Sequence, residues 1–149
     1  DSSAASVVAH FLDVLSLDVS REELGILYLQ PTSPLRTAAH ITSAIALAQN
    51  GDGVVSVVET EKSPYKSFKL NESGRLTSLF NQHLSNARRQ DLPRTYAPNG
   101  AIYIFSAANF VSNNGFPSND SLPFIMEKIE SVDVDTLEDI KYLESIIAG

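Results

Sequence analysis

The sequence predicts an α/β fold with a mostly parallel sheet, and three observations predict it. Residues 24–29 form a continuous apolar run, and residues 54–59 form a second run that is rich in β-branched side chains. The first run, which no charge interrupts, is typical of a strand that helices cover on both faces, and the second is typical of a strand because of its β-branched residues. Between them, residues 37–49 place apolar side chains at helical spacing, and Thr37 can serve as the N-cap. A strand, a helix and a strand in this order predict a right-handed parallel crossover.

The segment before the first strand predicts another helix. Apolar side chains recur at near-helical spacing from Val7 to Leu15, and Ser2 or Ser3 can cap the helix. His10 falls on this helix, where we expect a surface or packing role rather than a ligand role.

The middle of the chain differs in character from the strands on either side. Short, part-alternating runs at 65–70 and 75–80 flank a turn at 71–74 and predict a hairpin. Residues 81–96 are polar and poor in apolar side chains, and such a stretch in a compact domain is more often functional or covered by a partner than idle. We therefore interpret residues 62–96 as an arm that leaves the main sheet.

The remaining residues predict four further elements. The expected elements are a strand over 101–105, a helix over 107–111, a strand over 123–125 and a helix that begins after Thr136. Pro98-Asn99-Gly100 is expected to turn the chain into the first of these strands. Glu138 and Asp139 favour the start of the last helix, because acidic side chains are stabilising in a first turn.

Composition limits the classes of function. The 149 residues suit one soluble globular domain, and the net charge of −7 argues against a general nucleic-acid surface. No apolar run approaches the roughly 20 residues that cross a bilayer. The absence of cysteine excludes disulfides, thiolate metal sites and cysteine nucleophiles, and it is compatible with a reducing cytoplasm.

Charge is unevenly distributed along the chain. Residues 62–94 carry a net charge of +5, whereas the residues from Asp120 to the end carry a net charge of −6. The first segment could receive an anionic ligand and the second a cation. Solvated faces are the usual explanation of such runs and remain the alternative.

The loop after the first strand is a candidate lip of a binding crevice. Pro31 and Pro34 stiffen it, and ligands of open α/β sheets lie just beyond the carboxyl ends of strands. Gln30 offers both a donor and an acceptor, so it could orient a hydroxyl-rich ligand. The alternative is an ordinary connection from strand to helix that contains two prolines.

Two carboxylates stand two residues apart before the last helix. In an extended segment Asp133 and Asp135 project to one face and can converge on a hard cation such as Mg²⁺ or Mn²⁺. Such a cation could neutralise phosphate oxygens during displacement at phosphorus. Alternatively, Asp135 only contributes charge near the helix start and Asp133 is solvated.

Other side chains have a binding interpretation and a structural one. Arg88, Arg89 and Arg94 could grip a carboxylate or phosphate, or simply be surface arginines. Tyr103 and Phe116 could form an apolar wall for a ligand, or pack in the core. The sequence contains no glycine-rich phosphate loop of a familiar type, no paired metal-binding histidines and no serine in a nucleophile elbow.

Four motifs in order resemble one family, the CMP-N-acetylneuraminate synthetases or acylneuraminate cytidylyltransferases. The motifs are Leu-Gln-Pro-Thr-Ser-Pro-Leu-Arg at 29–36, Arg-Gln-Asp-Leu-Pro at 89–93, Pro-Asn-Gly-Ala-Ile-Tyr at 98–103 and Ser-Val-Asp-Val-Asp-Thr at 131–136. The resemblance covers essentially the whole chain and implies a Rossmann-like three-layer nucleotidyltransferase domain. It also implies that a sialic or related nonulosonic acid reacts with CTP to give a CMP-sugar and pyrophosphate.

The resemblance implies a role for each candidate residue. Asp133 and Asp135 would hold the catalytic Mg²⁺ or Mn²⁺. The implied contacts with the sugar acid come from Gln30, Lys66, Arg89, Tyr103 and Phe116, with Arg89 at the carboxylate. The family is dimeric and cytoplasmic, so the arm over 62–96 would cross to a partner and complete its site.

One departure from the family pattern bears on activity. The family begins with a strand and a loop rich in Arg, Gly, Ser and Lys that holds the CTP phosphates, and nothing before Leu24 resembles them. We therefore expect the chain to be the C-terminal part of such an enzyme, to lack most of the CTP site and to be inactive alone. The alternative is a truncated or non-catalytic module that binds the sugar acid and dimerises without turnover. N-acetylneuraminic acid is the expected substrate, with legionaminic or pseudaminic acid as relatives.

Overall fold

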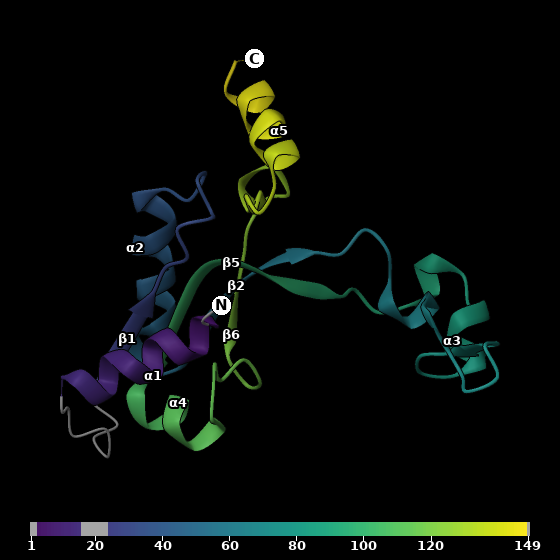
Figure 1. Ribbon diagram of the computed structural model, residues 1–149, viewed down its shortest axis with the longest axis horizontal. Coiled ribbons are helices and arrows are strands. Elements are labelled where there is room, and N and C mark those ends of the chain that lie inside the picture. Colours follow the sequence, from purple (N-terminus) through teal and green to yellow (C-terminus); the bar gives the residue numbers. More distant parts are fainter. Residues whose placement is uncertain (1–2, 16–23, 149) are drawn as a thin grey trace. The chain divides into compact units, whose positions relative to one another are not determined.

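The chain folds as two compact units. The computed structural model describes residues 3–15 and 24–148 (Figure 1). One unit comprises residues 1–57 and 98–149, and the other comprises residues 58–97. Within the described residues the strands form one four-stranded sheet and one two-stranded sheet.

The four-stranded sheet is mixed. Its strands are β1 (Gly25–Tyr28), β2 (Val54–Glu59), β5 (Tyr96–Ser106) and β6 (Leu122–Ile125), in the spatial order β1-β5-β2-β6. β2 and β6 pair in parallel, with Val54 opposite Leu122, and β1 and β5 pair antiparallel, with Tyr28 opposite Tyr103. The predicted strands are therefore present, but β5 separates β1 from β2, so these two strands are not hydrogen-bonded neighbours.

β1 is less buried than its apolar sequence predicts. Leu27 is 41% exposed and Gly25 is exposed, whereas Ile26 and Tyr28 are half-buried. Only β5 pairs with β1 among the described strands, and only the face with Ile26 and Tyr28 packs on a core cluster. The expectation of a strand buried on both faces is wrong for this part of the structure, because β1 lies at the end of the described sheet.

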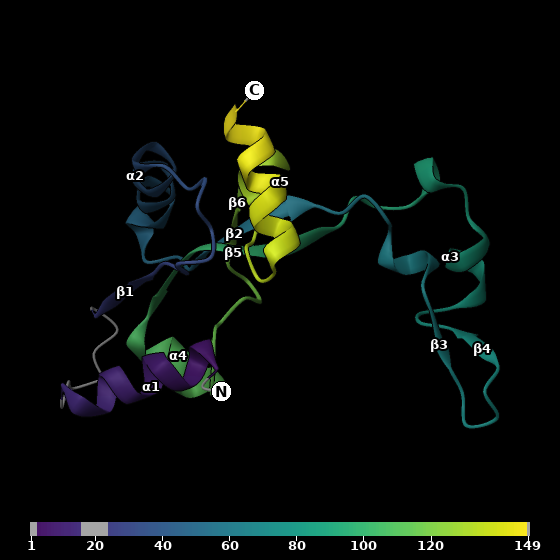
Figure 2. The same cartoon turned by 45° about the horizontal axis from the view of Figure 1, so that its top comes forward.

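The alternating side chains of β5 pack into two apolar clusters. The first cluster consists of Val8, Leu12, Phe105, Ala107 and Phe110. The second cluster consists of Ala44, Val54, Ala101, Ile102 and Met126. From Ile102 to Phe105 the side chains alternate as a strand requires, since Ile102 and Ile104 pack in the second cluster and Tyr103 and Phe105 in the first; Ala101 joins the second cluster beside Ile102. Helices α1 and α4 thus cover one face of β5 and α2 covers the other (Figure 2).

Three helices begin after the predicted capping residues. They are α1 (Ala4–Val14), α2 (Ala38–Leu47) and α5 (Leu137–Ala148), whereas α4 (Ala107–Asn113) begins after Ser106, a cap that was not predicted. Ser3 caps α1, and Thr37 and His40 exchange hydrogen bonds at the start of α2. Thr136 and Asp139 do the same at α5, and the hydrogen bonds from Thr136 hold the pKa of Asp139 below its usual range. None of the helices within the described ranges has the length and hydropathy of a membrane span.

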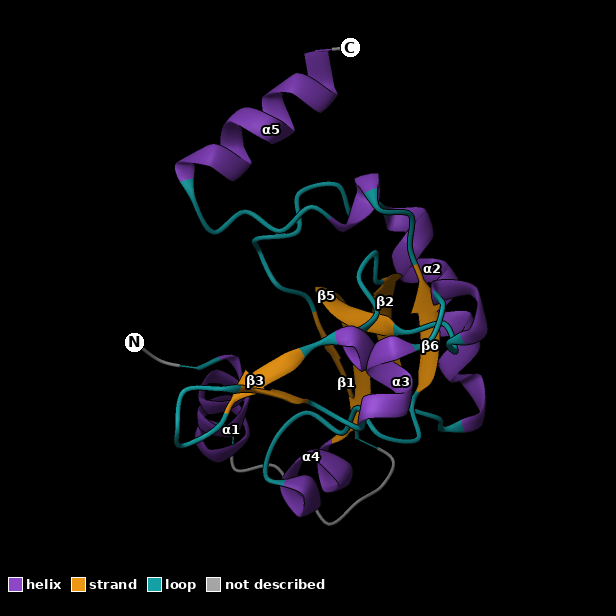
Figure 3. Ribbon diagram, turned by 90° about the vertical axis from the view of Figure 1, so that its right-hand side faces the viewer, coloured by secondary structure: helices purple, strands orange, loops and turns teal. Residues whose placement is uncertain are grey.

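The second unit contains the predicted hairpin. Strands β3 (Phe68–Leu70) and β4 (Leu76–Ser78) pair antiparallel, and the short helix α3 (Gln82–Asn86) follows (Figure 3). Asn71 Oδ1 accepts hydrogen bonds from the backbone N–H groups of Ser73 and Arg75, which closes the turn. The unit nearly coincides with the arm interpreted over 62–96. The role of the arm in dimerisation stays a prediction.

Candidate functional site

The residues before α5 form a segment with an inner and an outer face. Val132 is buried and Val134 is half-buried, whereas Asp133 and Asp135 are exposed. This alternation is that of extended backbone, in which residues two apart project to the same side. Both carboxylates therefore belong to the outer face of residues 131–135, which we call the acidic segment.

The acidic segment is attached to the loop over residues 30–36. The backbone N–H of Val134 donates to the carbonyl of Thr32 at 2.9 Å. Two motifs that are about a hundred residues apart in the chain therefore lie side by side. Because Val134 stands between the two aspartates, this bond holds the acidic backbone against the loop.

Arg36 fixes the loop from within. Its Nη1 donates to the carbonyl of Gln30 at 2.8 Å and to the carbonyl of Ala101, in β5, at 2.9 Å. A partly buried guanidinium that satisfies two carbonyls ties the loop to the sheet. The sequence places Arg36 on the loop but carries no signal for this role, because Ala101 is 65 residues away.

Gln30 lies against the backbone of β5 at Gly100. A Cβ at position 100 would overlap Gln30 Oε1, and Gly100 has a φ of 79°. Both facts favour glycine, since a side chain would collide with Gln30 and is disfavoured at positive φ. The expectation of a turn at Pro98-Asn99-Gly100 is wrong, because these residues lie within β5. The glycine instead permits the close approach of a side chain.

Tyr103 and Phe116 form an aromatic group with Tyr28. The ring centroids of Tyr103 and Phe116 are 4.8 Å apart, and those of Tyr28 and Phe116 are 5.2 Å apart. All three side chains are half-buried and pack on the first apolar cluster. They are therefore part of the core on one side and partly accessible on the other. Tyr28 was missed from the sequence, since only its pairing opposite Tyr103 brings it here.

Tyr103 is also electrostatically coupled to Asp133. Burial raises the pKa of the Tyr103 phenol, and the negative charge of Asp133 and the neighbouring Tyr28 raise it further. A low dielectric and a nearby anion both disfavour the phenolate. The Tyr103 phenol is therefore held in its neutral form, with Asp133 among the groups that disfavour its phenolate.

The two aspartates fit a magnesium-type site. Within the described ranges no group of three or more His, Cys, Asp and Glu side chains is arranged to hold a metal ion. Mg²⁺ commonly binds proteins through one or two carboxylates and completes its shell with water and substrate phosphates. Asp133 and Asp135, exposed on one face, have the chemistry for Mg²⁺ or Mn²⁺ held together with a phosphate-bearing substrate.

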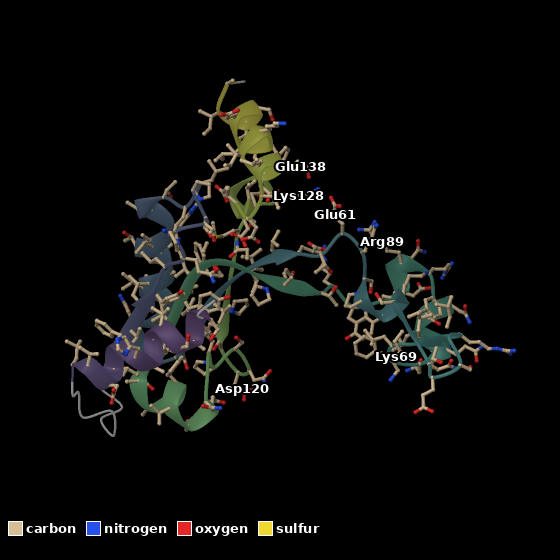
Figure 4. All side chains as sticks on the ribbon, in the orientation of Figure 1. Glu61, Lys69, Arg89, Asp120, Lys128 and Glu138 are labelled. Atoms are coloured by element: carbon tan, nitrogen blue, oxygen red, sulfur yellow. The ribbon has the colours of Figure 1, made fainter. Side chains whose placement is uncertain are left out.

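Lys66 and Arg89 belong to the second unit. Lys66 Nζ donates to the carbonyl of Ala87 at 2.5 Å, so its ammonium group has a partner within the unit. Arg89 begins the short 3-10 helix Arg89–Asp91 and is exposed (Figure 4). Its neighbour Arg88 pairs with Asp91 at 2.7 Å. Contacts of Lys66 and Arg89 with a sugar acid stay predictions.

Comparison with known proteins reveals relatives among sugar-acid cytidylyltransferases. The N-acylneuraminate cytidylyltransferase of Streptococcus agalactiae is 36% identical over 113 residues, and that of Escherichia coli is 34% identical over 116 residues. The chain is related to the acylneuraminate cytidylyltransferases. The CMP-N,N'-diacetyllegionaminic acid synthase of Legionella pneumophila is a further relative, 31% identical over 127 residues. These matches confirm the resemblance carried by the four motifs.

The matches cover unequal shares of the proteins. They include 74%, 76% and 83% of this chain, but the chain spans only 27% of the length of the first two relatives and 53% of the third. No protein-family model matches the chain. The sequence relationship is therefore established through individual relatives and over part of their length.

A solved structure confirms the fold class. The 4-diphosphocytidyl-2C-methyl-D-erythritol synthase of Anaerococcus prevotii superimposes with a TM-score of 0.60 over 100% of this chain and 68% of that chain. The two sequences are 8% identical, so the likeness concerns the fold alone. The predicted α/β, Rossmann-like nucleotidyltransferase fold is thus confirmed.

Proposed function

We propose that the complete protein transfers CMP from CTP to a sialic or related nonulosonic acid. The anomeric oxygen of the sugar acid forms a bond to the α-phosphorus of CTP, the bond from that phosphorus to pyrophosphate breaks, and the hydroxyl proton is released. The observation that carries the proposal is that three motifs meet, because Gln30 packs on Gly100 of β5 and the N–H of Val134, between the two aspartates, donates to the Thr32 carbonyl at 2.9 Å. The relationship to N-acylneuraminate cytidylyltransferases supports the same chemistry.

Asp133 and Asp135 are the residues that we propose to hold Mg²⁺ or Mn²⁺. A bound divalent cation would offset charge on the phosphate oxygens. The exposure of both carboxylates on one face supports this assignment. The backbone bond from Val134 to Thr32 supports it further, because it restrains the residue between the two carboxylates.

Gln30, Tyr103 and Phe116 are proposed to receive the sugar acid. The amide of Gln30 can donate and accept, which suits the hydroxyl groups of a sugar. Tyr103 and Phe116 offer apolar ring surface, and the neutral Tyr103 hydroxyl can donate a hydrogen bond. A largely apolar wall with a few polar groups is the usual composition of a small-molecule site.

The second unit is proposed to supply the carboxylate contact and the dimer interface. Arg89 is exposed, and a guanidinium binds a carboxylate through two parallel hydrogen bonds. Several large apolar side chains of this unit are exposed, which supports cover by a partner. They are Phe68, Leu70, Leu76, Leu79 and Phe80, with exposed fractions from 47% to 69%. We propose a homodimer in which Arg89 and Lys66 act in the partner's site, and a cytoplasmic reaction.

Release of pyrophosphate from CTP tests the proposal. The assay uses the full-length encoded protein and the 149-residue chain with N-acetylneuraminic acid and Mg²⁺. Legionaminic acid, pseudaminic acid, no sugar and no metal are the parallel conditions. Release by the full-length protein that needs both a nonulosonic acid and the metal is expected. Release without any sugar acid, or none with any of the three, would overturn the proposal.

A further inference from the structure

We infer that Asn99 positions the acidic segment and that it does so through Ser131. The inference rests on the proposed function, because the segment carries the two carboxylates assigned to the metal. Asn99 touches neither carboxylate, so its role is to place them. The buried side-chain amide of Asn99 in β5 thus determines the position of the outer face of residues 131–135.

Both polar atoms of the Asn99 side-chain amide have hydrogen-bond partners. The residue is 7% exposed, and its Nδ2 donates to Ser131 Oγ at 2.9 Å and lies 3.3 Å from Met126 Sδ. Its Oδ1 accepts from Ser56 Oγ at 2.6 Å and from the backbone N–H of Ala101 at 3.2 Å. The group therefore needs a donor and an acceptor at once, which an aspartate or a leucine cannot supply.

The bond to Ser131 has a counterpart at the other end of the segment. Ser131 is held by Asn99, and Val134 is held by the carbonyl of Thr32 at 2.9 Å. Asp133 lies between these two attachment points. Val132, also between them, is buried at 9% exposure and keeps the backbone from rotating outward. Asp133 is thus restrained on both sides without any bond to its own carboxylate being needed.

The arrangement indicates that the hydrogen bonds of Asn99 position residues 131–135 and do not only stabilise the fold. A buried polar network is costly to leave unsatisfied, but an apolar core of the same shape would stabilise the fold about as well. What the network adds is direction, since the backbone N–H of Ala101 holds Oδ1, with or without the Ser56 hydroxyl, and Nδ2 then points at Ser131. Ser131 Oγ in turn donates to the carbonyl of Glu127 at 2.8 Å, so its position is fixed from both sides.

Ser131→Ala is the variant that tests the inference. Replacing Asn99 itself would also remove the contacts with Ser56 and Ala101, which endangers the fold. Ser56→Ala is the matched control, because it breaks a bond at the other end of the same amide and frees the N–H of Ile102, which donates to Ser56 Oγ at 2.7 Å. Ser131→Thr retains the hydroxyl and should preserve the wild-type behaviour.

Two measurements on the 149-residue chain test whether Ser131 positions the acidic segment. Amide hydrogen exchange should become about fivefold faster at Val134 in Ser131→Ala, the effect of losing one hydrogen bond, and should change at Ile102 but not Val134 in Ser56→Ala. Mn²⁺ binding, followed by electron paramagnetic resonance, should weaken by a similar factor in Ser131→Ala alone. Unchanged exchange at Val134 and unchanged Mn²⁺ binding in a folded Ser131→Ala chain would overturn the inference.

A further variant separates this inference from the proposed function. If Asp133→Asn binds Mn²⁺ as tightly as the wild-type chain, the metal assignment fails. The exchange rate at Val134 still tests the attachment through Ser131 in that case, because it does not depend on the metal. Faster exchange at Val134 in Ser131→Ala would then support the attachment alone.

Discussion

The side-chain amide of Gln30 occupies the space that a Cβ at Gly100 would need. Gly100 also has a φ of 79°, so it meets two separate requirements for glycine. The contact joins the loop after β1 to the middle of β5. The position of Gln30, a proposed sugar-contacting residue, therefore depends on glycine at position 100.

Gly100→Ala should therefore lower the free energy of unfolding by more than the backbone strain at this position alone would. Gly51, with a φ of 83° and nothing within 4 Å of its Cβ position, provides the control. Gly51→Ala should lower the free energy of unfolding by about 1 kcal/mol, and Gly100→Ala by about 2 to 3 kcal/mol, since Gln30 must also move. Urea unfolding measures both. Equal losses would show that Gln30 makes no steric demand.

Replacing either aspartate of the acidic segment should impair turnover by the full-length protein. Asp133→Asn or Asp135→Asn removes a charge assigned to Mg²⁺ or Mn²⁺, and kcat should fall by on the order of a hundredfold, with a higher metal concentration needed for half-maximal rate. Glu138→Gln, an exposed acid in the first turn of α5, is the control and should change neither quantity. Near-normal activity would remove the altered aspartate from the metal site.

Tyr103 should make the stability depend on alkaline pH. Burial first, and then Asp133, raises the pKa of this phenol above its ordinary value of 10.0, so the unfolded chain loses the proton before the folded chain does. This contribution to the free energy of unfolding is complete below pH 10.0 and is lost as the pH rises through the folded-state pKa. Tyr103→Phe should show a shallower loss of stability in that range. Tyr142→Phe, on an exposed residue of α5, should follow the wild-type curve, and identical curves for all three proteins would contradict a raised pKa of Tyr103.

Arg89→Ala should weaken use of the sugar acid more than use of CTP. The KM for the sugar acid should rise about tenfold or more, because charge-assisted hydrogen bonds to a carboxylate contribute about 1.5 to 3 kcal/mol. Arg75→Ala, in the hairpin of the same unit, controls for loss of positive charge. Steady-state kinetics of the full-length protein with each substrate varied in turn give the comparison. Equal effects on both substrates would argue against assignment to the carboxylate.

Elements governed by local sequence were predictable. Thr37 and Thr136 start α2 and α5 as their hydrogen bonds to nearby residues dictate, and the β2 run forms a strand. The apolar run alone did not predict the exposure of β1, because that depends on its neighbours: β5, about eighty residues later in the chain, pairs with one side, and β1 ends the described sheet. Local pattern specifies a strand but not its neighbours.

The candidate site likewise contains residues that the sequence predicted and residues that it did not. Motif resemblance pointed to Gln30, Tyr103 and Asp133. Gln30 packs on Gly100 of β5, Tyr103 lies in β5, and Asp133 precedes Val134, whose N–H bonds the loop that carries Gln30. The residues that hold them were missed, since the partners of Asn99 and Arg36 lie 32 and 65 residues away. The sequence around Asn99 even led to the prediction of a turn in place of a strand, because Pro-Asn-Gly is typical of turns.

The cap at the start of α2 determines the proton position on an imidazole. His40 Nδ1 accepts the N–H of Thr37, so the ring proton resides on Nε2, which faces Glu130 Oε1 at 3.2 Å. One ring therefore links a helix start to the short 3-10 helix Ile129–Ser131. Lysine at this position could donate to Glu130 but offers no acceptor for the N–H of Thr37, and glutamate, the usual residue in such a cap, would meet Glu130 with like charge. Histidine is the side chain that serves both neighbours.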